Sequence, residues 1–531
     1  MPDKKYFQVP VLIIGGGVTG TGTARDLALR GIPSIVLEKQ TINAGASGRN
    51  HGLLHSGARY VLTDPASARE CKLEGDILKQ IAPQCIEESG GLYVATKADD
   101  ESYIHEFPKL CAAAGIPCEP MDIRDALALE PALAPDIAAA FRVEDAAVEP
   151  FHVSLENMHQ AVENGARYFN HCRVDAFRVS GRTIKRVTAT DLIRKRIFEI
   201  EARVVINAAG AWSGKIARMA GIKVEVLYSK GSLLITHSRL TRHVINRLRP
   251  PSDGDILVPG GTVSIFGTTS RRVTDPDGVR PGVDETRQLV EDAAALVPQL
   301  KQARYIRAYA GVRPLVVEHG DETENTGDDR SLSRGFSLKD HERHGIDNFI
   351  TITGGKMTTF RLMAEKASDL AAKKLGVNRP CRTHQVPLKS DAPSEMTEAG
   401  MAVKLRVMKK TANDITMCEC EMISRGQFKT LIQWLKKRKK RADLNTLRIH
   451  SRLGKGACQA TFCSQRVTAF MYDEAYLKED DGIYNIKDLL AERFIGQRPV
   501  LWDAQLAQAE LNEALYCGFY GLELEKGDPD L

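Results

Sequence analysis

The stretch VLIIGGGVTGTGTARDLALRGIPSIVLEK, residues 11–39, decides the fold of this chain of 531 residues. A β-branched apolar run leads through a glycine-rich turn into an Ala- and Leu-rich helical pattern, and a second β-branched run follows. Strand, tight turn, helix and strand in this order make one βαβ unit. We therefore predict an α/β fold that is built around this unit.

The turn of this unit indicates a ligand. Gly15, Gly17 and Gly20 stand in G-x-G-x-x-G order, and Glu38 follows the second strand, close to the spacing expected for an acid that binds a ribose. Glycines let the backbone approach a pyrophosphate, and the N-terminus of the following helix supplies positive dipole. A purely structural glycine turn is the alternative, but strand, helix and acid in register favour a dinucleotide site.

Composition limits the class of protein. The length predicts two or three domains, since a typical domain has roughly 100 to 200 residues. With 43% hydrophobic residues, 27% charged residues and 43 glycines, the chain resembles a soluble α/β protein and not a disordered one. The net charge of +5 is small for this length, so we expect no general affinity for nucleic acid.

Cysteine usage and apolar runs indicate the compartment. The 11 cysteines are odd in number and mostly scattered, unlike a secreted disulfide framework, and they predict a reducing, cytoplasmic environment. The early run VPVLIIGGGV fits a buried strand better than a signal peptide. No run reaches the roughly 18 apolar residues that a membrane helix needs. We therefore predict no transmembrane segment, with any membrane contact peripheral or through partners.

Two later segments also place a strand, small residues and a helix in sequence. They are RVVINAAGAW at 203–212, which precedes a helical pattern, and NFITITGGKMTTFRLMAEKA at 348–367. Both predict sheet edges that meet a ligand. Pro, Ser and Gly then mark a linker over 381–405, and residues 406–531 are expected to form a separate module.

The loop GASGRNHGLLHSGARYV, 45–61, extends these predictions to a family. Together with the glycine fingerprint, AAGAW at 208–212, AYAGVRPL at 308–315 and ITGGKMTTFRLMAE at 352–365, it closely resembles FAD-dependent glycerol-3-phosphate dehydrogenases. With its cysteine-containing tail, the chain resembles the large catalytic subunits of the anaerobic bacterial enzymes over nearly its whole length. The resemblance implies oxidation of sn-glycerol 3-phosphate to dihydroxyacetone phosphate, with electrons passed toward membrane quinone through partner subunits.

The resemblance also implies an architecture. A glutathione-reductase-type, Rossmann-like FAD domain would be interleaved with an antiparallel-sheet substrate domain over residues 1–380, and a small, mainly helical module would follow the linker. The FAD parts are expected at about 1–75, 146–224 and 336–380, and the substrate parts at about 76–145 and 225–335. Membrane-anchoring and electron-transfer subunits would hold the chain at the inner face of the cell membrane.

Site residues follow from the same resemblance. It assigns the substrate phosphate to Arg313 and Arg334, because a planar guanidinium can hold a phosphate through two hydrogen bonds. Lys356, unless it merely caps a loop, would stabilise negative charge on the reduced flavin together with a helix dipole. Arg59 and Tyr60 resemble the family's arginine–tyrosine pair near the flavin. The implied cofactor contacts are Gly15, Gly16, Gly17, Gly20, Glu38, Lys39, Ala46, Ser47, His51, Gly52, Leu53, Val174, Ala209, Gly210, Trp212, Gly355, Lys356 and Met357.

Oxidation of a secondary alcohol also requires a group that accepts the hydroxyl proton. His55 and His51 are the candidates, since imidazole titrates near physiological pH and both lie in the loop expected to line the flavin. A structural role is the usual one for a single histidine. We favour His55 over His51, although the respiratory members of the family place a histidine where this chain has Leu233.

Four cysteines near the C-terminus are arranged in two close pairs. Cys418 and Cys420 form C-x-C, and Cys458 and Cys463 form C-x4-C. The set resembles the [2Fe-2S] module of the bacterioferritin-associated ferredoxin type, and four thiolates suit such a cluster. Zinc and incidental cysteines are the alternatives, but the usual zinc pairs are C-x2-C to C-x4-C. A one-electron centre beside a two-electron flavin would lead electrons singly to a partner.

A basic run and two other functions remain open. The cations from Lys436 to Arg441 predict a solvated face, a contact with anionic lipid, or a contact with an acidic partner protein. The loop 45–61 also resembles the flavin loop of L-2-hydroxyglutarate dehydrogenases, so a 2-hydroxy acid is an alternative substrate. A non-catalytic flavoprotein with a redox-sensing or assembly role is a third interpretation, which the complete set of Arg313, Arg334 and Lys356 argues against.

Overall fold

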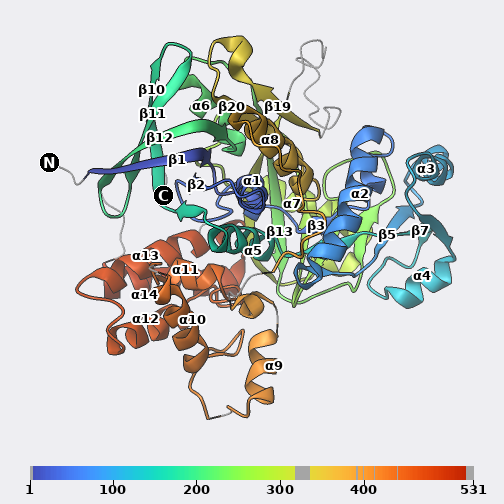
Figure 1. The fold of residues 1–531 in the computed structure, drawn as a ribbon. Helices are drawn as coiled ribbons and strands as arrows, with labels where there is room; N and C mark the ends of the chain where they lie inside the picture. Colours follow the sequence, from blue (N-terminus) through green and yellow to red (C-terminus); the bar gives the residue numbers. More distant parts are fainter. Residues whose placement is uncertain are drawn as a thin grey trace.

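The computed structural model describes residues 4–316, 335–389, 393–398, 400–411, 413–438, 440–494 and 496–521. Within them two large sheets and a helical C-terminal module make up the molecule (Figure 1). The predicted strand, helix and strand over residues 11–39 are confirmed as β1 (Lys4–Ile14), α1 (Val18–Leu29) and β2 (Ser34–Leu37). No helix in the described ranges is long and apolar enough to cross a bilayer.

The first sheet contains the glycine-rich turn. Its strands run in the order β10-β11-β12-β1-β2-β9, with β20 beside β12 and β19 beside β20. β1 pairs in parallel with both β2 and β12, and β12 pairs in parallel with β20. The further strands are β9 (Arg167–Phe169), β10 (Cys172–Ser180), β11 (Thr183–Asp191), β12 (Arg196–Asn207), β19 (Phe336–Asp340) and β20 (Phe349–Gly354).

Both faces of this sheet are covered, and the alternation along β1 shows how. Val11 and Ile13 point into a core that they share with α1, α5 (Pro150–Glu163) and α8 (Phe360–Leu375). Leu12 and Ile14 point into a second core with β10, β11 and α6 (Ser213–Arg218). All four side chains are at most 5% exposed, as expected for a strand buried on both faces.

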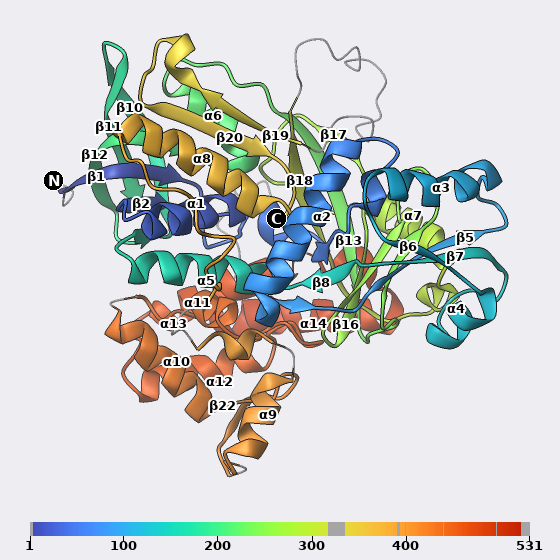
Figure 2. The same ribbon diagram turned by 45° about the vertical axis from the view of Figure 1, so that its right-hand side comes forward.

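The second sheet is mostly antiparallel and lies beside the first (Figure 2). Its order is β17-β13-β16-β15-β14-β5-β7-β6, and β18 pairs with β13 over most of its length. Its strands are β5 (Gly91–Thr96), β6 (Cys118–Met121), β7 (Ile137–Val143), β13 (Leu227–Thr236), β14 (Val244–Arg247), β15 (Ile256–Gly260), β16 (Val263–Gly267), β17 (Arg271–Val273) and β18 (Tyr305–Leu315). Helices α2 (Pro65–Ile81), α3 (Glu101–Ala113), α4 (Ile123–Leu129) and α7 (Val283–Ala294) belong to this part of the chain.

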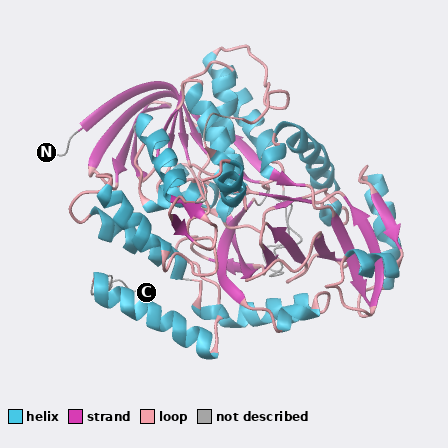
Figure 3. Ribbon diagram, turned by 90° about the horizontal axis from the view of Figure 1, so that it is seen from below, coloured by secondary structure: helices cyan, strands magenta, loops and turns pink. Residues whose placement is uncertain are grey.

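A small sheet connects the loop 45–61 to the segments 86–87 and 146–148. β8 (Ala146–Val148) lies between β3 (Leu53–Leu54) and β4 (Ile86–Glu87). β3 is the centre of the loop 45–61, so its pairing with β8 fixes the middle of the loop. Figure 3 shows the strands of one sheet reaching the edge of the molecule near the N-terminus, with helices packed along the inner part of the fold.

The C-terminal module is helical and has a core of its own. Its core includes Phe428, Leu431 and Leu489, all fully buried, together with Cys418 and Cys463. It docks below α5, as Figures 1 and 2 both show, and the Ala308 N–H of β18 donates to the Gly496 carbonyl at 2.7 Å. Its elements are α9 (Met401–Met408), β21 (Thr416–Cys418), β22 (Ile423–Ser424), α10 (Arg425–Lys437), α11 (Leu444–Ile449), α12 (Cys463–Asp473), α13 (Asp481–Phe494) and α14 (Asp503–Tyr520).

Candidate functional site

A cavity of about 530 Å³ opens where β1, β12 and β20 end, and walls from both sheets close it. This is the crevice at the carboxyl ends of parallel strands, where open α/β sheets bind ligands. The predicted cofactor contacts that line it are Gly15, Gly17, Glu38, Lys39, Ala46, Ser47, His51, Leu53, Val174, Ala209, Gly210, Trp212, Gly355, Lys356 and Met357. Gly16 and Gly20 lie behind this lining, and Gly52 faces a second cavity.

The glycine turn is shaped by close backbone approaches. Gly15 has φ +115°, and a Cβ there would lie 2.4 Å from the Ala208 carbonyl oxygen. A Cβ on Gly20 would lie 2.0 Å from the Gly15 carbonyl oxygen, so α1 can pack against the turn because this residue is glycine. Glu38 accepts a hydrogen bond from the Gly16 N–H at 2.7 Å. The turn is therefore built to hold a ligand at the N-terminus of α1.

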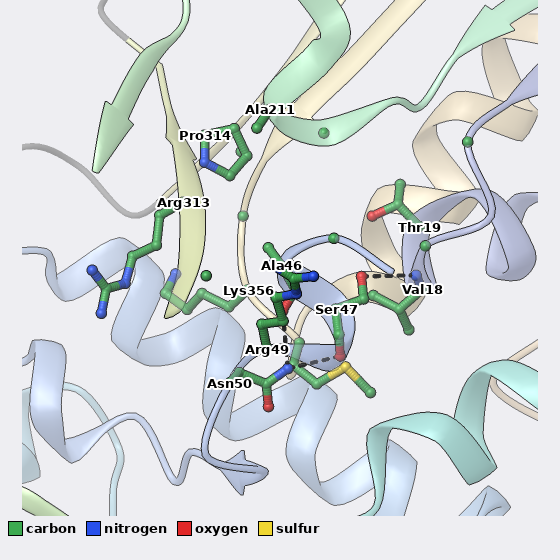
Figure 4. Close-up of a pocket in the computed structure, with 18 of the residues that line it drawn as sticks. Val18, Thr19, Ala46, Ser47, Arg49, Asn50, Ala211, Arg313, Pro314 and Lys356 are labelled. Carbon is green, nitrogen blue, oxygen red and sulfur yellow. Dashed lines mark hydrogen bonds between the residues drawn. The ribbon is translucent and has the colours of Figure 1, made fainter. Parts of the chain in front are cut away.

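The loop 45–61 lies across the cavity and is fixed to the start of α1. The Val18 N–H donates to Ser47 Oγ at 3.0 Å, and Asn50 Nδ2 donates to the Ser47 carbonyl at 2.8 Å (Figure 4). In the same view Arg313 and Lys356 extend toward one part of the cavity from different elements. Residues distant in the sequence thus meet at one site.

Arg313 is held in place before any ligand arrives. It lies on β18 opposite Ser229 of β13, and its Nη1 donates to the Thr269 carbonyl at 3.2 Å. Its Nη2 donates to Thr268 Oγ1. A Cβ on Gly231 would lie 2.4 Å from the guanidinium, so a side chain there would displace the guanidinium from this position. The other predicted phosphate ligand, Arg334, lies outside the described residues.

Both candidate proton acceptors line the cavity, with ring centroids 6.1 Å apart. His55 Nε2 lies 3.3 Å from the Tyr60 hydroxyl, whereas His51 Nδ1 is buried without a hydrogen-bond partner in the described chain. Burial and the nearby Arg313 and Arg59 lower the pKa of His51 to about 3. Burial, His51, Arg59 and Lys356 lower the pKa of His55 well below its usual value. Both imidazoles are therefore neutral at pH 7.

Next to His55 lie two cationic side chains and an aromatic ring, those of Arg59, Lys356 and Tyr60. The Lys356 ammonium lies 4.8 Å from the centre of the Tyr60 ring. Arg59 Nη2 lies 2.9 Å from a carboxylate oxygen of Asp255, which is buried. Burial lowers the pKa of Arg59, but Asp255 outweighs that effect and the pKa is raised. The positive charges of the site are thus held in fixed positions.

Sequence reasoning missed several members of the site. Asp255 comes from the loop just before β15, and no local motif marks it. Asp277 also lines the cavity and links two other residues of its lining. It accepts hydrogen bonds from Trp212 Nε1 at 2.8 Å and from Lys215 Nζ at 2.7 Å. One signal in the sequence could have predicted a further member of the site. Alternate residues of a strand lie on the same face, and β18 places on the face of Arg313 the residues Arg307, Tyr309 and Gly311. Tyr309 does contact the loop 45–61, because its hydroxyl donates to the Asn50 carbonyl at 2.7 Å.

The four predicted cysteine ligands come together in the module. The Cys458 thiol interacts with the thiols of Cys420 and Cys463, and Cys463 also interacts with Cys418. These contacts, Cys420 first, lower the pKa of Cys458. Even so, no group of three or more His, Cys, Asp or Glu side chains in the described chain has the geometry to hold a metal ion. The thiols are neighbours, but their arrangement is not a coordination shell.

The basic run packs partly on aromatic rings. Lys436 Nζ lies 3.9 Å from the centre of the Tyr476 ring, and Arg438 lies 4.4 Å from that of Trp434. Lys440 also lies over Trp434, at 5.2 Å. These contacts give three of the cations a role within the module.

Comparisons with known proteins agree with this geometry. A model of the FAD dependent oxidoreductase family matches residues 10–367. The A subunit of the anaerobic glycerol-3-phosphate dehydrogenase of Escherichia coli K12 is 40% identical over 98% of both chains, and the A1 subunit of the Haloferax volcanii enzyme is 37% identical over 95% of this chain and 89% of its own. Glycerol-3-phosphate dehydrogenase from Bacillus halodurans, solved with FAD, shares the fold at 20% identity with a TM-score of 0.62, covering 93% of this chain and 96% of its own. These matches confirm the predicted α/β fold class.

Proposed function

Because the chain belongs to the FAD dependent oxidoreductase family, and within it to the anaerobic glycerol-3-phosphate dehydrogenases, we propose that it oxidises sn-glycerol 3-phosphate to dihydroxyacetone phosphate. The observation that carries the proposal is 40% identity over 98% of both chains. The cavity supports it, since Arg313, Lys356 and two neutral imidazoles meet there beside a dinucleotide turn.

The residues present fit FAD. Gly15 and Gly17 line the cavity with backbone alone, where a pyrophosphate would lie, and Glu38 borders the same cavity where a ribose would lie. Ala46, Ser47 and Leu53 of the loop 45–61 would contact the ring system. FAD bound there supplies the acceptor for the hydride that leaves the alcohol carbon.

The chain's own residues would bind and orient the substrate. Arg313, fixed by Thr268 and Thr269, offers a guanidinium to the phosphate, and Arg334 is proposed as its second ligand. Lys356 and Arg59 would hold negative charge that develops in the site. Holding the substrate at its phosphate leaves the secondary hydroxyl free to approach the imidazoles.

We assign acceptance of the hydroxyl proton to His55, with His51 as the alternative. A neutral imidazole is required, and burial keeps His55 neutral. Its Nε2 contacts the Tyr60 hydroxyl, which orients the ring. His51 is also held neutral, by burial and by Arg313. The contact with Tyr60 makes His55 the better positioned of the two imidazoles. Since we assign the proton transfer to His55, the substitution His55→Asn should lower kcat much more than His51→Asn.

We propose that electrons leave through a [2Fe-2S] cluster bound by Cys418, Cys420, Cys458 and Cys463. The four cysteines supply the all-thiolate donor set that such a cluster requires, and Cys420 is exposed at the surface. Since the described thiols do not form a coordination shell, their side chains would have to turn toward a common centre when the cluster binds. Bound zinc in place of iron would contradict the relay. The proposed division of labour is a flavin domain and a substrate domain over residues 1–380 and an electron-exit module over 406–531.

Partner subunits are proposed to dock on this module and to link it to the membrane quinone pool at the cytoplasmic face. Most of the large apolar side chains that are exposed in the described chain lie there. Phe462 is 59% exposed beside Cys463, and Val407 and Met408 of α9 are similarly open. Such a concentration is typical of an interaction surface.

The deciding experiment is dye reduction by the purified, FAD-loaded chain. Glycerol 3-phosphate should reduce the dye, and L-2-hydroxyglutarate should not. Turnover with the 2-hydroxy acid alone would replace the substrate, and no turnover with either would favour a non-catalytic flavoprotein. Release of FAD on denaturation provides the control for cofactor content.

A further inference from the structure

A second cavity, of about 1110 Å³, lies between the loop 45–61, β18 and the C-terminal module. Arg307 of β18, Arg448 of α11, Arg493 of α13 and Arg49 of the loop all line it. Four guanidinium groups from four different elements therefore face one space. None of them has a role in the oxidation proposed above.

The carboxylates near these arginines do not balance them. Glu492 is the carboxylate that the four arginines share. Its Oε1 lies 3.7 Å from Arg307 Nη2. Burial raises the pKa of Glu492, but the four arginines together outweigh burial and lower it. Asp488 also lines the cavity and accepts a hydrogen bond from Asn445. Among the described residues of this cluster, four positive charges thus meet two negative ones.

The other charged residues that line this cavity balance one another. Arg280 and Glu398 carry opposite charges, Lys39 lies 3.9 Å from Asp277, and the rest form closer ion pairs. Arg452 Nε lies 2.6 Å from Glu421, Lys455 lies 3.6 Å from Glu149, and Arg239 lies 2.6 Å from Glu87. These pairs leave the excess of about two charges with the four arginines. The excess is therefore local to the space between β18, α11 and α13.

Two of the four are buried without sufficient partners. Arg307 is 6% exposed and Arg493 is 7% exposed. The Nε atom of each is buried and has no hydrogen-bond partner in the part of the chain that the structure describes. Burying a cation and leaving its donors unsatisfied is costly unless an anion compensates it. Guanidinium groups from separate elements also match the tetrahedral oxygens of a phosphate.

We propose that this cavity binds a phosphate dianion, free or as a small phosphomonoester, and that the bound anion ties the C-terminal module to the flavin loop and β18. Two negative charges match the excess of the cluster. The site is separate from that of Arg313, which lies six residues further along β18, about 20 Å in an extended strand. It does not depend on the proposed catalytic reaction.

The test is equilibrium dialysis of full-length, FAD-loaded protein with radiolabelled inorganic phosphate at constant ionic strength. The Arg313→Gln background removes the proposed substrate site, so that the second site is measured alone. We expect about one phosphate per chain in this background and a loss of at least tenfold in affinity when Arg493→Gln is added. Arg498→Gln, an exposed arginine near the same helix, is the matched control and should leave binding unchanged.

Folding and identity of the ligand are checked separately. Arg493→Gln removes a charge that is surrounded by like charges, so the thermal midpoint without phosphate should not fall. Competition by glycerol 2-phosphate at lower concentrations than inorganic phosphate would identify a phosphomonoester, and preference for inorganic phosphate would identify the free ion. Both outcomes support the site.

Three outcomes would overturn the proposal. Equal phosphate binding with and without Arg493→Gln would exclude the cluster as the ligand site. An equal loss in Arg498→Gln would indicate surface binding. The third outcome is unchanged phosphate binding in Arg493→Gln together with a shifted reduction potential of the proposed cluster at the four cysteines. That result would show that the charge of Arg493 acts on the nearby Cys463 and not on an anion in the cavity.

Discussion

Replacing Arg313 with alanine should weaken the use of glycerol 3-phosphate far more than it disturbs the fold. The side chain is fixed by Thr268 and Thr269 and accommodated by Gly231, so its donors are oriented before the substrate binds. A hydrogen bond to a charged group contributes about 1.5 to 3 kcal/mol. With about 1.4 kcal/mol per factor of ten, kcat/KM should fall roughly 10- to 150-fold.

The loss should appear mainly in KM, because the phosphate takes no part in the bond changes and is held equally in ground and transition states. Steady-state dye reduction over a range of glycerol 3-phosphate concentrations measures this. Unphosphorylated glycerol is the internal control, since Arg313→Ala and the parent protein should use it equally poorly. Arg271→Ala, an exposed position on neighbouring β17, is the matched control variant. An equal loss with both substrates would refute the phosphate role.

Three other expectations follow from the same geometry. Gly15→Val should abolish FAD retention, measured as flavin absorbance per chain, since the φ of +115° and the Ala208 carbonyl leave no space for a side chain; full retention would contradict the turn's role. Cys458→Ser should lose iron while glycerol 3-phosphate still bleaches the flavin; a normal iron content would remove Cys458 from the ligand set. His450 lies where the module contacts the rest of the chain, and burial and Lys440 lower its pKa to about 4. Its imidazole therefore stays neutral in the folded protein at pH values at which, below about pH 6.5, the same imidazole takes up a proton in the unfolded chain. Stability should therefore fall by up to about 1.4 kcal/mol per unit as pH drops from 6.5 toward 4, and His450→Asn should flatten that slope in chemical unfolding; an unchanged slope would exclude His450 as its source.

Local signals explain what the sequence predicted well. The strand, turn and helix of residues 11–39 are specified by periodicity and by glycines whose close approaches the structure shows at Gly15 and Gly20. The loop 45–61 was predicted from its resemblance to a known family, and the resemblance could be read because the residues of this loop that line the cavity are contiguous in the sequence. Ten consecutive residues contain four side chains that line the first cavity, namely His51, His55, Arg59 and Tyr60. One motif therefore predicted most of one side of this cavity.

Long-range pairing explains what was missed. Gly231 lies beside the Arg313 guanidinium because β13 and β18 pair with Gly231 opposite Gly311, and this register cannot be read from either segment alone. Asp255 reaches Arg59 from a part of the chain 196 residues away. Trp212 and Asp277 meet over 65 residues. Such partners depend on tertiary structure, and no local pattern of residue types distinguishes them from surface charges.

β18 connects the flavin cavity to the second cavity. Arg313 faces the flavin cavity near one end of the strand, Arg307 faces the second cavity near the other end, and the loop 45–61 crosses between them at Tyr309 and Gly311. The module is attached to the same strand, since the Ala308 N–H donates to Gly496. A shift of the module would therefore be transmitted to the strand that holds Arg313, the proposed substrate ligand, because paired strands move together with their hydrogen bonds. An anion bound at Arg307 would resist that shift and keep the proposed substrate site and the proposed electron exit in one fixed arrangement.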